Sequence, residues 1–341
     1  MDVANNWKDY EILDMANGEK LERWGNVVLI RPDPQIIWKN KSFPEKWNKA
    51  NARYNRSSSG GGAWKYNSKV PENWQIKYKD LVFNIKPMGF KHTGLFPEQA
   101  VNWEWMISKI QNAKREIKVL NLFAYTGGAT VACSYAGASV CHVDSSKGMT
   151  TWAKENIVSS GLKDRPVRFI VDDVVKFVNR EIRRGNKYDG IIMDPPSYGR
   201  GTNGEVWKFE DNISDLVELC SKVLSDKPLF FLINSYTTGI SSTVLENILR
   251  LNIKKDGKFS NGEIGLPMAN SKLILPCGIY GKWESKWGKI VKICIYIKVS
   301  NVFFYFWFEC LRWGPTSLQT VKRNDSEVFT VCTMLGAENQ K

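Results

Sequence analysis

The stretch Val119–Gly128 has the sequence VLNLFAYTGG. The residues that follow it, Ala129–Ala136, predict a helix that ends at Gly137. The apolar first half of the stretch, Val119–Phe123, predicts a buried strand. Paired glycines after a strand let the backbone approach a ligand closely, and the following helix offers its N-terminus to a cofactor. A tight turn without a ligand explains the glycines equally well. The third glycine of a dinucleotide-binding G-x-G-x-x-G site is missing.

Strand-like and helical stretches alternate over residues 87–287. Further predicted strands end at Val143, Val171, Met193 and Ile233, and predicted helices cover Lys147–Ser160, Val174–Arg184, Ile213–Leu224 and Ser241–Leu251. This order predicts an α/β fold with a Rossmann-like, doubly wound and mostly parallel sheet. Ligands bind at the carboxyl ends of the strands in such sheets, so the residues after each strand are the candidates for chemistry.

Acidic residues follow the second and third of these strands. Asp144 ends the second strand, and its carboxylate suits the two hydroxyls of a ribose. A helix N-cap near Lys147 is the alternative role for Asp144. Asp172 and Asp173 follow the third strand, where one carboxylate suits the amino group of an adenine. An N-cap at Asp173 is an equally good interpretation.

The loop Asp194-Pro195-Pro196-Ser197-Tyr198 follows the fourth strand. Two prolines stiffen the loop and remove two backbone donors, while their carbonyls remain free to accept hydrogen bonds. Such a loop suits the amino edge of a nucleobase, on whose face Tyr198 would stack. Asp-Pro-Pro also occurs as a plain turn, so the prediction depends on its place after an apolar strand. Asp194, Pro195, Pro196 and Tyr198 are the candidate catalytic residues.

Four stretches together resemble one bacterial family, the S-adenosylmethionine-dependent methyltransferases similar to the 23S ribosomal RNA cytosine-C5 methyltransferases. These stretches are Lys91–Gln99 (KHTGLFPEQ), Asn121–Gly128 (NLFAYTGG), Asp172–Val174 (DDV) and Asp194–Tyr198 (DPPSY). The resemblance covers roughly residues 87–284 and implies S-adenosylmethionine as the cofactor.

The resemblance also implies roles for single residues. Those implied to bind the cofactor are Thr93, Gly94 and Phe96 at its flank, Tyr125 and Gly127 at its methionine part, Asp144 at its ribose, and Asp173, with Asp172 beside it, at its adenine. Asp194 and Pro196 are implied to lie beside the transferred methyl group.

The chain departs from this family in three places. Its N-terminal region does not resemble the PUA-type RNA-binding domain of the best-known members, and its tail after Lys286 has no counterpart. Cytosine-C5 transfer needs a thiolate that adds to the base, and Asn234-Ser235-Tyr236 stands where such members carry a cysteine. Cys277 is the other thiol considered, and we interpret it as a loop thiol because nothing in the sequence lowers its pKa. The cofactor is therefore implied, and the methylated atom is not.

Two regions flank the methyltransferase domain at residues 87–287. Residues 1–86 are rich in Trp, Lys and short apolar alternations and predict a small β-rich accessory domain, with strands at Val27–Ile30 and Val82–Ile85. Residues 288–341 form an atypical tail, in which Ile290–Trp313 is dense in hydrophobic residues without a persistent helical or strand period. That run is long enough to span a bilayer, but charged residues interrupt it. We therefore favour a packed extension or a non-native extension of the reading frame.

The composition bears on partners and setting. A formal net charge of +13 suggests an anionic partner, most simply RNA, although a generally basic protein is the plainer alternative. Only His92 and His142 are present, which excludes a His-rich metal site. Met1–Tyr10 carries no apolar run, so no signal peptide and a cytoplasmic setting are expected. Basic and aromatic residues of the N-terminal region are candidates for RNA contact, and a solvated face with a small core explains them equally well. They are Arg53, Arg56, Trp64, Lys65 and Trp74.

The leading hypothesis is an S-adenosylmethionine-dependent methyltransferase that acts on a base of ribosomal or other RNA. The alternatives are a methyltransferase for a small molecule or a protein, and a binding protein that keeps the fold without turnover. An NAD-dependent oxidoreductase is disfavoured by the missing third glycine.

Overall fold

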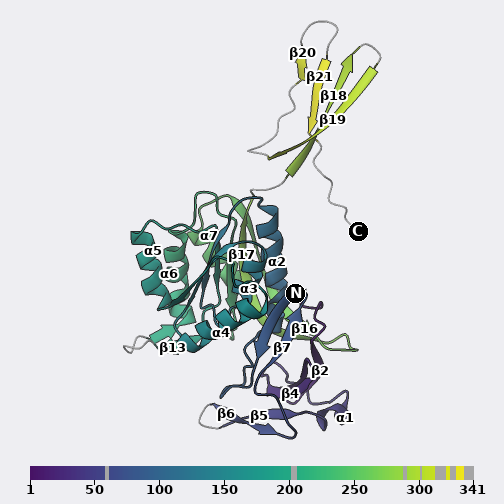
Figure 1. Cartoon of the computed structure of the whole chain (residues 1–341), viewed down its shortest axis with the longest axis vertical. Coiled ribbons are helices and arrows are strands. Elements are labelled where there is room, and N and C mark those ends of the chain that lie inside the picture. The colour runs from purple at the N-terminus through teal and green to yellow at the C-terminus, as the bar shows by residue number, and fades with distance from the viewer. Residues whose placement is uncertain are drawn as a thin grey trace. The chain divides into compact units, whose positions relative to one another are not determined.

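The computed structural model describes residues 1–57, 61–200 and 206–286, together with the backbone of four strands between Ile290 and Thr333. The chain forms two compact units, Met1–Ser285 and Lys286–Lys341. The first unit contains a large central sheet, an N-terminal sheet and helices (Figure 1). The second unit contains one small sheet.

An eight-stranded sheet, in the order β1-β16-β17-β15-β12-β9-β10-β11, forms the centre of the first unit. Its strands are β1 (Asp2–Val3), β9 (Lys118–Leu122), β10 (Ser139–Asp144), β11 (Val167–Val171), β12 (Gly190–Met193), β15 (Phe230–Ser235), β16 (Gly257–Pro267) and β17 (Ile274–Ser285). The five strands from β15 to β11 pair in parallel, whereas β17 runs antiparallel to β15 and β16. The predicted Rossmann-like, doubly wound and mostly parallel sheet is confirmed.

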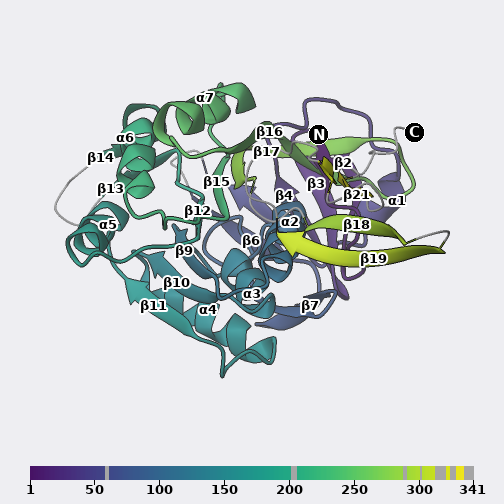
Figure 2. The same ribbon diagram turned by 90° about the horizontal axis from the view of Figure 1, so that it is seen from above.

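Helices cover both faces of this sheet (Figure 2). They are α2 (Ala100–Asn112), α3 (Gly128–Tyr135) and α4 (Lys147–Ser159) on one face, and α5 (Val174–Arg183), α6 (Phe209–Ser221) and α7 (Ser242–Asn252) on the other. Successive strand residues supply the two cores, because side chains alternate across a sheet. Val119 and Ile192 pack in the first core, and their neighbours Leu120 and Ile191 pack in the second. Burial on both faces explains why these strands are continuous apolar runs.

The N-terminal region is β-rich, as predicted. Its five-stranded sheet has the order β2-β3-β4-β5-β6, and a separate hairpin, β7–β8, follows. The elements are β2 (Tyr10–Ala16), β3 (Glu19–Trp24), β4 (Val27–Pro32), the short helix α1 (Pro44–Trp47), β5 (Ala52–Arg56), β6 (Gly62–Tyr66), β7 (Trp74–Tyr78) and β8 (Leu81–Ile85). The predicted strands Val27–Ile30 and Val82–Ile85 lie in β4 and β8.

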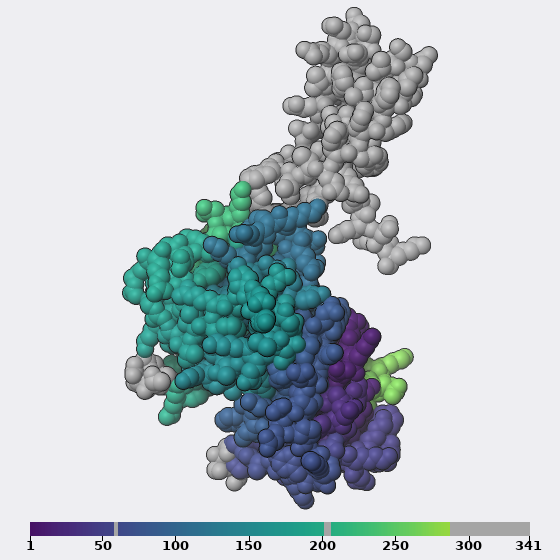
Figure 3. Space-filling view, viewed as in Figure 1, coloured from purple at the N-terminus to yellow at the C-terminus, as the bar shows by residue number. Residues whose placement is uncertain are grey.

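The N-terminal region shares a hydrophobic core with the first face of the large sheet. β1 pairs in parallel with β16 and so belongs to the large sheet itself. The ring centroid of Trp103 in α2 lies 6.1 Å from that of Trp7 and 5.1 Å from that of Phe83 in β8. In Figure 3 the purple and blue N-terminal residues adjoin the teal residues of the large sheet and its helices. The N-terminal region is thus packed against the face of the large sheet that α2 covers.

The tail contains a four-stranded sheet in the order β19-β18-β21-β20. Its strands are β18 (Ile290–Val299), β19 (Val302–Leu311), β20 (Thr320–Lys322) and β21 (Val328–Thr333). Most of Ile290–Trp313, in which no strand period is recognisable from the sequence, forms an antiparallel pair of strands. Trp313 lies outside the described residues. Within the described part of the chain, no helix is long and apolar enough to cross a membrane.

Candidate functional site

The loops after β9 and β12 leave adjacent strands where the sheet reverses its winding. β9 pairs with β10 on one side and with β12 on the other, in parallel in both cases. Ligands bind in the crevice at such a switch point. The fold therefore brings Asn121–Gly128 and Asp194–Tyr198 to one edge of the sheet, as the alternation of strands and helices predicted.

The backbone of the loop after β9 is unusual. Phe123, Tyr125 and Gly127 have φ values of +53°, +50° and +80°. Left-handed φ values are uncommon outside glycine, and such strained residues cluster at ligand sites. A Cβ atom on Gly127 would come within 2.9 Å of the Ala153 Cβ atom, so only glycine allows α3 to begin here.

Asp144 lies half-buried at the end of β10, and both of its carboxylate oxygens accept backbone hydrogen bonds. Oδ2 accepts from the N–H of Tyr125 and Oδ1 from the N–H of Ser146, each at 2.8 Å. Burial raises the pKa of Asp144 above its usual range despite these two donors. The alternative role as the N-cap of α4 is wrong, because Ser146 is the N-cap and its hydroxyl accepts from the N–H of Met149.

The residues Thr93, Gly94 and Phe96 lie beside the loop after β9. The Thr126 hydroxyl donates to the carbonyl of Gly94, whose φ is +100°. The Phe96 ring centroid lies 5.6 Å from that of Tyr125. Thr93 is fully buried, and its hydroxyl has no hydrogen-bond partner among the described residues. An orphaned buried hydroxyl at this place is a group that a polar ligand would satisfy.

Asp172 and Asp173 lie after β11, at some distance along the sheet edge from β9. Asp173 is the N-cap of α5, and its Oδ1 atom accepts from the N–H of Lys176 at 2.9 Å. The N-cap interpretation is thus confirmed, and one carboxylate oxygen is occupied by it. Asp172 forms an ion pair with Arg180 and accepts a hydrogen bond from the N–H of Asp173.

Asp194 is half-buried at the end of β12. Burial, and then the nearby carboxylate of Glu98, raise the pKa of Asp194 to about 7. The expectation that both proline carbonyls stay free is wrong for Pro196, whose carbonyl accepts from the Trp207 indole N–H at 2.7 Å. The Ser197 hydroxyl accepts from the Thr237 hydroxyl at 2.9 Å, which ties the loop to the end of β15. The loop is therefore fixed from two sides.

Tyr198 begins a short hairpin of β13 (Tyr198–Arg200) and β14 (Val206–Lys208). Its side chain is 51% exposed, and its hydroxyl accepts from the Nε atom of Arg200 at 2.9 Å. The ring is accordingly open to a stacking partner, although Arg200 fixes its outer end.

A buried polar network next to these loops was not predicted from the sequence. The Tyr236 hydroxyl donates to Glu98 Oε1 at 3.0 Å and accepts from the Gln99 amide at 2.8 Å. Asn102 of α2 donates to Gln99 and to Asn234 of β15, at 2.8 and 2.9 Å. Burial raises the pKa of Glu98, and it raises that of Tyr236 together with the charges of Glu98 and Asp194. These residues join the Thr93–Phe96 stretch to the end of β15.

No activated thiol stands at this site in the described part of the chain. Ser235 stands where the cytosine-C5 methyltransferases carry a cysteine. Its side chain is buried, and its hydroxyl accepts from the N–H of Thr237. Cys277 lies in β17 rather than in a loop, at a bulge where Gly278 pairs with Ile264 and Pro276 with Gly265. Burial and the charge of Glu98 raise the pKa of the Cys277 thiol well above its usual value. The thiol is therefore neutral at physiological pH.

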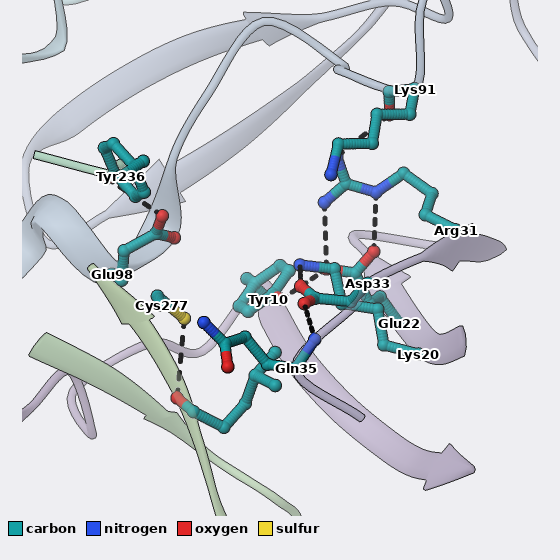
Figure 4. Close-up of polar contacts among 11 residues, drawn as sticks. Tyr10, Lys20, Glu22, Arg31, Asp33, Gln35, Lys91, Glu98, Tyr236 and Cys277 are labelled. Atoms are coloured by element: carbon teal, nitrogen blue, oxygen red, sulfur yellow. Dashed lines mark hydrogen bonds and ion pairs between the residues drawn. The ribbon is translucent and has the colours of Figure 1, made fainter. Parts of the chain in front are cut away.

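The N-terminal sheet holds residues 88–91, here named the 88–91 segment, against the site. Side chains of three of its strands donate to backbone carbonyls of this segment: Trp64 to Met88 at 2.8 Å, Tyr54 to Gly89 at 3.2 Å and Arg31 to Lys91 at 3.1 Å. The last of these is drawn in Figure 4. The Tyr125 hydroxyl lies 4.0 Å from the sulfur of Met88, so the segment contacts the loop after β9. Trp64, considered above for RNA contact, thus has a structural role.

A family of known proteins matches this arrangement. The model of the S-adenosylmethionine-dependent methyltransferase family matches residues 49–248, more than half of the chain. The chain belongs to this family. It is a methyltransferase whose cofactor is S-adenosylmethionine.

One solved structure agrees with this methyltransferase assignment, and a second shows the same fold. A S-adenosylmethionine-dependent methyltransferase from Agrobacterium tumefaciens is 35% identical, with a TM-score of 0.80 over 84% of this chain and 93% of that one. A methyltransferase from Streptococcus mutans shares the fold at 19% identity, with a TM-score of 0.62 over 82% of this chain and 76% of that one.

Curated relatives cover a shorter stretch of the methyltransferase. The ribosomal RNA large subunit methyltransferase K/L of Shewanella frigidimarina is 32% identical over 145 residues, which are 42% of this chain and 20% of that protein. Its counterpart from Colwellia psychrerythraea is 26% identical over 53% of this chain and 23% of that protein. The chain thus spans about a fifth of the length of these relatives.

Proposed function

We propose that this methyltransferase transfers a methyl group to a nitrogen of an RNA base. The observation that supports the proposal is that Asp194 and Tyr198 lie on one loop at the carboxyl end of β12. A half-buried carboxylate with a pKa of about 7 lies four residues before an exposed aromatic ring on a rigid loop. A carboxylate accepts from the N–H edge of a base, and an aromatic ring stacks on its face. Planar, polar acceptors such as nucleobases suit this pair.

The cofactor side of the site fits S-adenosylmethionine. When bound, this cofactor supplies a methyl group already activated on a sulfonium. Each Asp144 oxygen accepts one backbone N–H and can accept one ligand hydroxyl as well, which suits a ribose. We assign the methionine part to the residues that line the loop after β9, and the adenine to the end of β11. The residues with these proposed roles are Thr93, Gly94, Phe96, Tyr125, Gly127, Asp172 and Asp173.

The acceptor side has to orient the base and exclude water, because the methyl group needs no further activation. Asp194 would hold the base edge in line with the methyl group, and such positioning supplies a large part of the barrier reduction. The Pro196 carbonyl accepts a hydrogen bond from the Trp207 indole N–H. We therefore expect this carbonyl to stiffen the loop rather than to bind the base. Pro195 and Pro196 fix the direction in which Asp194 points.

The chemistry of the thiols favours a nitrogen over a ring carbon as the acceptor atom. Methylation of cytosine C5 needs a thiolate that adds to the ring. All four described free cysteines have thiol pKa values raised by burial, and they are Cys133, Cys141, Cys220 and Cys277. A ring or amino nitrogen accepts a methyl group without covalent activation. Cys277→Ala should accordingly retain full activity. A loss of activity in this variant would instead support covalent catalysis through Cys277.

RNA as the substrate is supported by charge and by the relatives. The net charge of +13 favours a polyanionic partner. The curated relatives are named as methyltransferases of ribosomal RNA, although they match over only about a fifth of their length. We propose a cytoplasmic setting, in which the free thiols of the described cysteines would stay reduced.

The decisive experiment maps modified nucleosides by mass spectrometry in ribosomal RNA from a strain without this gene and from its parent. We expect one methylated base to disappear. The purified protein should restore the mark on that RNA with labelled S-adenosylmethionine, and Asp194→Ala protein should not. Identical maps, together with no incorporation into any RNA, would rule out the proposal.

A further inference from the structure

Four charged residues of β3, β4 and the turn after β4 form a paired cluster in the N-terminal sheet (Figure 4). Arg31 binds the Glu22 carboxylate through Nε at 2.6 Å and through Nη2 at 2.9 Å. Lys20 Nζ lies 3.2 Å from Asp33 Oδ2 and 3.7 Å from Glu22 Oε1. Both carboxylates of the cluster are thus already used by these two cations.

Two further cations next to this cluster have no acidic partner among the described residues. Lys91 is half-buried, and Arg56 is exposed at the end of β5. Arg56 follows Tyr54 by two residues in β5, and the Tyr54 hydroxyl donates to the Gly89 carbonyl at 3.2 Å, in the same 88–91 segment as Lys91. Glu22 and Asp33 are paired with Arg31 and Lys20, so neither carboxylate of the cluster forms an ion pair with Lys91 or Arg56.

Lys91 lies in the chain two residues before the Thr93–Phe96 stretch of the methyltransferase site. Its carbonyl is held by Arg31, and Thr93 and Phe96 follow it in the chain. The charges of Lys20 and Arg31 act on Glu98, and those of Lys20 and Glu98 both act on Cys277. In Figure 4, Cys277 accordingly lies between the charged cluster and the Glu98–Tyr236 pair. The charged cluster thus lies near Glu98, whose carboxylate in turn acts on Asp194.

Burial and like charges make an isolated lysine costly at this position. Burial first, and then Lys20, Arg56 and Arg31, lower the pKa of Lys91 to about 8. The same causes lower the pKa of His92 to about 3, so this histidine is neutral and adds no charge. A bound anion would remove the repulsion and return the Lys91 pKa toward its usual value.

We propose that Lys91 and Arg56 bind a backbone phosphodiester of the RNA next to the target base. The inference rests on the proposed function. Two cations with hydrogen-bond donors on adjoining elements match the charge and the oxygen atoms of a phosphodiester. Contacts to the backbone set the register of the strand and do not depend on the base. The N-terminal sheet would thereby position the target base against Asp194.

The test measures binding of a labelled single-stranded RNA of mixed sequence to the full chain as the salt concentration is varied. We expect Lys91→Gln and Arg56→Gln each to weaken binding by about fivefold and to reduce the slope of log K against log salt by about 1. Lys91→Arg should bind like the wild type. Lys163→Gln is the matched control, because Lys163 is exposed before β11, at the opposite edge of the sheet.

Calorimetry with S-adenosylmethionine distinguishes this site from a cofactor site. We expect Lys91→Gln to keep the wild-type cofactor affinity, and a matching loss of that affinity would assign Lys91 to the cofactor and overturn the proposal. RNA affinity and salt slope equal to those of the wild type in both Gln variants would overturn it as well. Such a result leaves the proposed function standing, whereas a wild-type protein that binds no RNA would overturn both.

Discussion

The carboxylate of Asp144 accepts a hydrogen bond from the backbone N–H of Tyr125 at 2.8 Å, which joins the end of β10 to the loop after β9. The same carboxylate accepts from Ser146 at the start of α4. One aspartate thus orders three chain segments around the proposed ribose site. Its position after a parallel strand is where nucleoside cofactors meet this type of sheet.

Asp144→Ala should weaken S-adenosylmethionine binding by at least about a hundredfold, or about 2.7 kcal/mol. The substitution removes the two proposed hydrogen bonds from the ribose hydroxyls to the carboxylate, and each contributes roughly 1.5–3 kcal/mol. Isothermal titration calorimetry measures the effect. Ser146→Ala is the control, because it removes the N-cap of α4 and leaves the carboxylate in place. Wild-type affinity in Asp144→Ala would remove this residue from the cofactor site.

Asp194 should govern the pH dependence of methyl transfer. Only its ionised form accepts from the base edge, and burial with the charge of Glu98 places its pKa at about 7. We expect kcat/KM to fall as the pH drops through about 7. Asp194→Asn should lose at least about a hundredfold in kcat, by analogy with the removal of other preorganised groups, and should show no such pH step. Its cofactor affinity should stay at the wild-type value, and retained turnover would argue against this role.

The strand ends were predictable from the sequence because parallel strands place their carboxyl ends together. Asp144 and Asp194 could be located once the strand–helix order was recognised. The roles of single carboxylates were harder to assign, since Asp173 both follows a strand and precedes a helix, and it does cap α5.

The network around Glu98 could not be predicted, because its members lie far apart in the chain. Tyr236 follows Glu98 by 138 residues, and nothing near either residue indicates the pair. Cys277 was misassigned for a local reason, because Pro276 and Gly278 are typical of turns. In the structure both residues lie in a strand, and a bulge between them accommodates the proline. By contrast, α2 has apolar residues at helical spacing, such as Trp103, Met106 and Ile110, and could have been predicted.

Glu22→Gln should lower the free energy of unfolding by about 3–5 kcal/mol, because it leaves Arg31 buried without its counter-ion. Burial alone would raise the pKa of Glu22, but Arg31 and Lys20 hold it at about 2. The ion pair therefore stabilises the fold above the pKa of an unfolded glutamate, and this stability is lost as the pH falls from about 4.5 toward 2.

Denaturant unfolding at neutral and acid pH measures this loss. Glu11→Gln is the control, since its ion pair with Arg23 is about a third exposed, far more than the Glu22–Arg31 pair, and should contribute less than about 1 kcal/mol. An effect of Glu22→Gln no larger than that of the control would show that the buried pair is not a main source of stability.

Trp64→Phe should weaken cofactor binding without a contact to the cofactor. The substitution keeps the aromatic ring against Tyr54 but removes the indole N–H that donates to the Met88 carbonyl at 2.8 Å. A lost hydrogen bond of about 1 kcal/mol would loosen the 88–91 segment, which contacts Tyr125 through Met88. We therefore expect the Kd for S-adenosylmethionine to rise by about fivefold in calorimetry.

Trp74→Phe is the matched control for this positioning role. Its indole N–H donates to the Trp24 carbonyl at 2.9 Å, inside the N-terminal region and away from the 88–91 segment. Both variants should lose similar stability in thermal unfolding, and only Trp64→Phe should change the Kd. Equal Kd values in the two variants would show that the N-terminal sheet does not act on the cofactor site through this segment.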